Sequence, residues 1–254
     1  MPNYFPDTNV LIDFGRNPAT RTKLENLRQG GNTFLVAPPA LIELVRGIIA
    51  SGCDTFANDK QVFAWLQTNR LPILELPRPF MAKVLRCSLP RVSGVRPHHY
   101  RQQIEMIANS VNFDDFLRES QAPGSVWGDI ARADEIHCAV LDREFRALGW
   151  LANQRRDRDL AQRLSQLFGA PGCRPKPVII ERQFSAAIEF LKSSLSKVRA
   201  GAKPRKNDPG LYTDFQLLLY LADPDLNFLT REDFSMEIRR SRQKARIVHP
   251  DSLS

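Results

Sequence analysis

The stretch that decides the fold class is YFPDTNVLID, residues 4–13. Its first apolar residues predict a short buried strand, and the polar residues that begin at Asp7 predict a turn leading into a helix. Thr8 or Asn9 could cap that helix. Pro6 has no N–H group to donate to a neighbouring strand, so we expect the strand to end or to bulge there.

The same alternation of strand and helix continues after a turn at residues 30–32. Pro38 and Pro39 suit the first turn of a helix, where a missing N–H costs little. The spacing of apolar residues around them predicts a strand at residues 34–36, helices over residues 41–48 and 59–69, and a short strand at residues 71–76.

The C-terminal part of the chain is also predicted to alternate between helices and strands. Its apolar spacing predicts a helix over residues 212–222, a strand at residues 227–230, a helix over residues 232–243 and a last strand at residues 245–248. Strands that alternate with helices at both ends of the chain indicate an α/β fold with a parallel sheet. The ligand sites of such sheets lie at the carboxyl ends of the strands.

The middle of the chain, residues 80–205, is predicted to be a large α-helical insertion. Helical spacing recurs near residues 79–88, 98–111, 126–148, 154–168 and 181–199, with loops rich in Pro, Gly and basic residues between them. Residues 178–180 are the one candidate strand. We therefore expect residues 1–79 and 206–254 to form one discontinuous domain around the insertion.

The composition is that of an ordinary globular protein, with 43% hydrophobic and 25% charged residues. The net charge of +8 favours a polyanionic partner such as nucleic acid. The first residues do not read as a secretory signal, and no apolar run approaches the ~18 residues of a membrane span. We expect a cytoplasmic protein without a membrane partner.

Acidic residues occur where the strands of such a sheet would end. They are Asp7, Glu43, Asp214 and either Glu232 or Asp233. Carboxylates gathered in one place repel one another, and a hard cation such as Mg²⁺ or Mn²⁺ is the usual way to stabilise them. Taken singly, each acid could instead be a turn residue, a solvated helix residue or a partner of a helix dipole.

The order of these acids resembles that of the PIN-domain family. Residues 7–11 are similar to its opening motif, residues 39–44 to its second, residues 214–222 to its third and residues 228–234 to its fourth. The resemblance implies a three-layer α/β fold, with a central parallel sheet flanked by helices. It also implies metal ligation by the matching acids. Those acids are Asp7, Glu43, Asp214 and Glu232.

Three features depart from the family pattern. Pro6 stands where family strands usually carry an apolar residue with a free N–H. The long insertion separates the second motif from the third, and Glu232 stands where the family usually has Asp. Asp233 follows directly, and adjacent residues cannot both face one ion. Glu232 holds the matching position, while Asp233 stays an alternative catalytic acid. The resemblance further implies that Thr8, Asn9 and Thr230 position metal-bound water or phosphate, with capping and turn formation as their alternative role.

The function implied by the resemblance is that of a divalent-metal-dependent endoribonuclease, acting either as a toxin with an antitoxin partner or in RNA processing. The alternative is a PIN-fold protein that binds nucleic acid or serves as a scaffold through its insertion. Lys203, Arg205 and Lys206 precede the third motif and are expected to contact RNA phosphates, unless they are only a solvated charge run. Another protein partner and self-association stay open.

Overall fold

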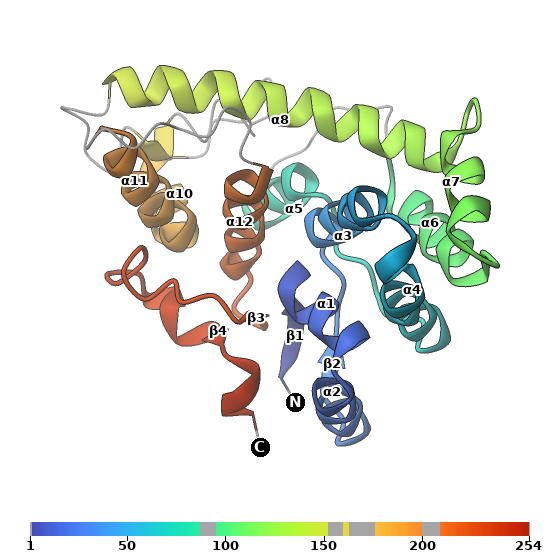
Figure 1. Ribbon diagram of the computed structural model, residues 1–254. Coiled ribbons are helices and arrows are strands. Elements are labelled where there is room, and N and C mark those ends of the chain that lie inside the picture. Colours follow the sequence, from blue (N-terminus) through green and yellow to red (C-terminus); the bar gives the residue numbers. More distant parts are fainter. Residues whose placement is uncertain (1, 87–94, 152–159, 163–175, 200–208, 254) are drawn as a thin grey trace.

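The computed structural model describes residues 2–86, 95–151, 160–162, 176–199 and 209–253. Within these residues four strands form one all-parallel sheet in the order β2-β1-β3-β4. The strands are β1 (Asn3–Pro6), β2 (Thr33–Phe34), β3 (Leu226–Leu229) and β4 (Ile247–Val248). The fold is α/β with helices flanking the sheet, as the sequence predicts (Figure 1).

The two ends of the chain meet at the centre of the sheet. β1 pairs with β3 so that Phe5 lies opposite Phe228 and Pro6 opposite Leu229. Phe5 and Phe228 are fully buried and stack with ring centroids 5.0 Å apart. Burial of such large rings is the main source of stability in a core, so this contact fixes the register in which the first and last motifs meet.

Pro6 is accommodated because β2 has already ended. The Tyr4 carbonyl accepts the N–H of Leu35 on the β2 side, and the Asp7 N–H donates to the Leu229 carbonyl on the β3 side, at 2.9 Å. Backbone groups alternate between the two sides of a strand, so the nitrogen of Pro6 faces β2. β1 ends at Pro6, which confirms one of the two expected outcomes. The predicted strand at residues 71–76 is only an isolated bridge, in which Ile73 pairs with Val36.

Helices follow β1 and β2 and fill most of the remaining chain that the structure describes. Before the predicted insertion they are α1 (Thr8–Arg16), α2 (Pro18–Gln29), α3 (Pro38–Ser51) and α4 (Cys53–Thr68), and α5 (Pro77–Val84) crosses its start. Within it they are α6 (Pro97–Asn109), α7 (Phe113–Gln121), α8 (Val126–Leu151), α10 (Pro177–Gln183) and α11 (Ser185–Arg199), and α12 (Pro209–Leu219) follows it. Several of these helices begin with Pro, whose fixed φ suits a first helical turn.

Two expectations from the sequence are wrong, and helix α7 lies where the apolar spacing indicated no element. Residues 178–180 belong to helix α10 rather than to a strand. The chain over residues 232–241 forms bends and turns where a helix over residues 232–243 was expected. It is followed by a 3₁₀ turn, η2 (Arg242–Arg246), in which the buried Gln243 and the half-buried Arg246 bond to carbonyls of other segments. These tertiary bonds outweigh the local preference for a helix. The expected helix over residues 154–168 lies mostly outside the described residues.

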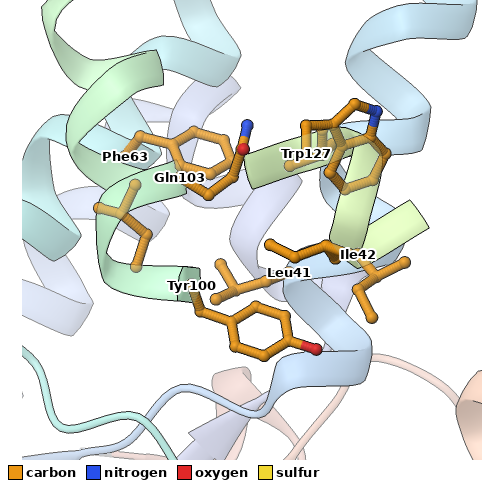
Figure 2. A pocket seen from close by; sticks show the side chains of 9 residues that line it. Leu41, Ile42, Phe63, Tyr100, Gln103 and Trp127 are labelled. Atoms are coloured by element: carbon orange, nitrogen blue, oxygen red, sulfur yellow. The ribbon is translucent and has the colours of Figure 1, made fainter. Parts of the chain in front are cut away.

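The helices of the predicted insertion share a core with the rest of the chain. α6 packs along α4, and α8 lies across α6, α11 and α12. Figure 2 shows the contact with α3, where Leu41 and Ile42 face Tyr100 and Trp127 around a cavity of about 10 Å³. The ion pair between Arg46 of α3 and Asp134 of α8, at 2.6 Å, adds a polar link. The insertion is therefore packed directly against the helix that carries Glu43.

The packing of α1 on α4 depends on Gly15. A Cβ atom at this position would lie 2.6 Å from the Asn58 carbonyl oxygen and 3.0 Å from Cγ2 of Val62. We expect Gly15→Ala to lower the free energy of unfolding by about 1–3 kcal/mol, because the helices must move apart. The matched control is Gly47→Ala on α3, where nothing lies within 4 Å. Alanine should raise stability there by up to about 1 kcal/mol. Urea unfolding of both variants measures the difference, and equal effects would contradict the proposed close contact.

Candidate active site

Asp7 lies at the carboxyl edge of the sheet, between the end of β1 and the start of α1. It is 5% exposed. Its Oδ1 accepts the N–H of Val10 at 2.7 Å, so Asp7 is the N-cap of α1. This corrects the expectation that Thr8 or Asn9 caps the helix. The cap holds the carboxylate in one orientation at the positive end of the helix dipole.

Thr230 links Asp7 to the end of β3. Its hydroxyl donates to Oδ2 of Asp7 and accepts the N–H of Glu232 at 3.0 Å. Thr230 is almost fully buried. Both oxygens of Asp7 therefore have a donor, and the loop that carries Glu232 starts from a residue that touches Asp7.

Each of the two residues after Asp7 donates a hydrogen bond to the carboxylate of another acidic residue. Oγ1 of Thr8 donates to Oε2 of Glu43 at 2.6 Å, and Nδ2 of Asn9 donates to Oε1 of Glu232 at 2.8 Å. Thr8 and Asn9 thus bring an acid from α3 and an acid from the loop after β3 towards Asp7, the N-cap of α1. We call Asp7, Glu43 and Glu232, together with Thr8, Asn9 and Thr230, the acid frame. The family resemblance implied that Thr8, Asn9 and Thr230 position metal-bound water or phosphate. In the structure these three residues donate hydrogen bonds to carboxylates.

The charges of the acid frame act on one another. Burial first, and the nearby carboxylates of Glu232 and Glu43 in addition, raise the pKa of Asp7 to about 6, although hydrogen bonds from Thr230 and Val10 oppose the rise. A raised pKa means that ionising this carboxyl costs more free energy in the folded chain than in water. The acid frame is therefore electrostatically unfavourable without a counter-charge, as expected of a site for a cation.

The raised pKa of Asp7 predicts how stability depends on pH in EDTA. The folded state holds the proton more tightly than the unfolded state, so stability falls as pH rises from about 4 to about 6, by about 3 kcal/mol for this group. Asp7→Asn removes the ionising group, so the variant should lose this part of the pH dependence and be more stable than the wild type at pH 7. Urea unfolding across that pH range tests this. A variant much less stable than the wild type would show that Asp7 has a structural role.

The remaining predicted acids have different surroundings. Asp233 is exposed, its Oδ1 accepts the N–H of Ser235 at 2.8 Å, and it is not among the carboxylates that raise the pKa of Asp7. The structure therefore brings Glu232, rather than Asp233, to Asp7. Asp214 is half-buried on α12, which packs against α3, the helix of Glu43. Lys203, Arg205 and Lys206 lie outside the described residues.

Arg231 is a residue near the site that no sequence pattern indicated. Its Nη2 donates to Oδ2 of Asp13 at 2.6 Å and to Oγ1 of Thr20 at 3.2 Å. Burial opposes ionisation of Asp13, but bonds from Thr20 and Arg231 and the charge of Arg231 keep the pKa of Asp13 below its usual value. Arg231 thereby ties the loop that carries Glu232 to α1 and α2. Contacts of this kind, over 200 residues apart in the chain, leave no local pattern.

The donors of the acid frame suit a hard divalent cation, because all of them are oxygens and at least three are carboxylates. In the side-chain positions described, however, no three residues of the types His, Cys, Asp and Glu stand close enough to hold a metal ion together. The carboxylates of Glu43 and Glu232 are turned towards Thr8 and Asn9 instead. The chemistry of the site fits a metal, and the side chains of Glu43 and Glu232 would have to come closer to Asp7 to ligate one ion together with it.

Comparison with protein-family models, with curated proteins and with solved structures found no match for this chain. No helix in the described part of the chain has the length and apolar character needed to cross a membrane.

Proposed function

We propose that the chain is a divalent-metal-dependent endoribonuclease with a PIN-like three-layer fold, and that the acid frame is its active site. The observation that carries the proposal is that Thr8 and Asn9, the two residues after the buried Asp7, hydrogen-bond Glu43 and Glu232, while Thr230 bonds Asp7 itself. The raised pKa of Asp7 supports a site that needs a cation. The order of motifs shared with the PIN-domain family and the net charge of +8 support RNA as the substrate.

In this proposal Mg²⁺ or Mn²⁺, when bound, polarises the phosphodiester and helps to ionise the attacking water. Asp7 would be the fixed ligand, because its backbone and its carboxylate are both held in place. Glu43 and Glu232 would complete the ligand set, with Asp214 as the fourth acid implied by the family resemblance. Thr8 and Asn9 keep the two glutamates next to Asp7 until the ion binds, and Thr230 orients the carboxylate of Asp7.

Two roles are predicted for the ribonuclease, that of a toxin with an antitoxin partner and that of an RNA-processing enzyme. A cytoplasmic location and self-association also stay predictions. The alternative is a PIN-like protein that binds nucleic acid without cutting it. In the described side-chain positions, the acids of the acid frame do not stand close enough together to hold one metal ion, and this favours that alternative. Loss of cleavage upon chelation separates the two functions.

The test is RNA cleavage with Mg²⁺ or Mn²⁺, with and without EDTA, for two neighbouring variants. Glu232→Gln should lower the cleavage rate by about 10²-fold, because it removes a ligand charge. Asp233→Asn should leave it within about 3-fold, because Asp233 lies outside the acid frame. Cleavage that continues in EDTA would refute the metal-dependent mechanism. A larger loss for Asp233→Asn than for Glu232→Gln would show that Asp233, rather than Glu232, is the acid of the active site.

A further inference from the structure

A hollow lies beside the acid frame, between the loop that follows β3 and the residues around β4. Its volume is about 310 Å³, at the lower end of the roughly 300–1,000 Å³ typical of sites for small ligands. Thr230 and Glu232 belong both to the acid frame and to the lining of the hollow. Whatever occupies the hollow is therefore next to the proposed point of cleavage.

Two side chains that can donate hydrogen bonds to a phosphate, those of Lys244 and His249, belong to the lining of the same hollow. Lys244 is exposed, and its Nζ lies 3.4 Å from the Ser235 carbonyl oxygen, a weak contact that a stronger acceptor can replace. His249 accepts the N–H of Asp251 on Nδ1 at 3.2 Å. A neutral ring in this arrangement carries its proton on Nε2, which is left to donate. The apolar part of the lining consists of Phe234, Ile238 and Ile247.

Asp233 lines the same hollow as Lys244. A phosphate that enters the hollow would be attracted by Lys244 and repelled by the carboxylate of Asp233. Removing the charge of Lys244 should therefore weaken phosphate binding, and removing the charge of Asp233 should strengthen it. The same changes at charged residues outside the hollow should have smaller effects.

We propose that the hollow binds one nucleotide of the RNA strand, the one beside the bond that the acid frame cuts, with Lys244 and His249 contacting its phosphate. The proposal rests on the ribonuclease function proposed above. The ammonium of Lys244 and the ring of His249 can donate to a backbone phosphate, and the apolar residues of the hollow can pack against the ribose and base. The hollow is formed by residues of the loop after β3 and around β4. A nucleotide bound there would therefore make contacts beyond those with the metal ligands.

Binding of a labelled single-stranded RNA to the full chain in EDTA tests the proposal without any cleavage. Lys244→Ala should weaken binding several-fold and reduce the slope of log K against log salt by about 1, because one phosphate contact is lost. Asp233→Asn should strengthen binding about 2-fold. The charge-matched controls are Lys83→Ala on α5 and Asp114→Asn on α7, which are exposed and outside the hollow. These controls should shift affinity much less.

A competition experiment identifies the ligand class. Uridine 5′-monophosphate should displace the RNA at a lower concentration than inorganic phosphate at equal ionic strength, and Lys244→Ala should remove that difference. Equal displacement by the two would overturn the nucleotide assignment, and equal effects of Lys244→Ala and Lys83→Ala would overturn the site. If Lys244→Ala weakens RNA binding but no metal-dependent cleavage is found, the nucleotide site is supported and the ribonuclease function is refuted. If the chain cleaves RNA but Lys244→Ala has no effect on binding, the ribonuclease function is supported and the nucleotide site is refuted.

Discussion

Asp7→Asn is expected to lower the rate of RNA cleavage by about 10³-fold or more at saturating Mg²⁺ or Mn²⁺, since it removes the central ligand charge of the site. The fold should survive the change. Asn is as good an N-cap as Asp, so its Oδ1 can still accept the N–H of Val10. Its Nδ2 can donate to the hydroxyl of Thr230, which now accepts instead of donating.

Single-turnover cleavage of a labelled RNA, together with circular dichroism and urea unfolding in EDTA, measures both parts of this prediction. Asp114→Asn is the charge-matched control, because Asp114 is exposed on α7. It should cleave at the wild-type rate. An Asp7→Asn variant that cuts RNA as fast as the wild type would remove Asp7 from the site and with it the metal assignment.

Gln243→Leu is expected to have the largest effect on stability, about 3–5 kcal/mol, because it leaves several buried groups without partners. Nε2 of Gln243 donates to the carbonyls of Gln183 and Leu221, the latter at 2.8 Å, and Oε1 accepts the N–H of Ala186 at 2.8 Å. One buried side chain thus joins the segment after β3 to the break between α10 and α11. Leucine has a similar size but cannot form any of these bonds.

The matched control for this variant is Gln102→Leu, an exposed position on α6. Its effect on the free energy of unfolding should stay within about 0.5 kcal/mol. Thermal or urea unfolding measures both. A loss below about 1 kcal/mol for Gln243→Leu would mean that water or other groups satisfy these backbone partners, and that the insertion is held to the sheet mainly by apolar packing.

The parallel sheet and the position of Asp7 could be predicted because both depend on local patterns. Strand β1 is a short apolar run, and an acid that follows such a run lies at the carboxyl edge of a parallel sheet. The contacts within the acid frame could not be predicted from those patterns. Thr8 is 35 residues from Glu43, and Asn9 is 223 residues from Glu232, so only the folded chain shows that they touch.

The segment at residues 232–243 is a case in which the local sequence pattern predicted the wrong structure. Its composition suits a helix, but bonds from Gln243 and Arg246 to carbonyls of Leu221 and Leu226 hold the chain in another shape. Local preference is a difference of a few tenths of a kcal/mol per residue, whereas each buried bond to a carbonyl is worth about 1 kcal/mol. That shape also creates the hollow beside Glu232, which a regular helix over the same residues would have replaced.

The measurement that tests the central claim most directly is the anomalous difference density of crystals soaked in Mn²⁺. We predict a peak enclosed by Asp7, Glu43 and Glu232, with carboxylate oxygens at about 2.1 Å from the ion, as is usual for small hard cations. Glu43 and Glu232 should then have left Thr8 and Asn9, and the peak should be absent from Asp7→Asn. Density for Mn²⁺ only elsewhere, or none at Asp7 under conditions that support cleavage, would contradict a metal-dependent active site in the acid frame.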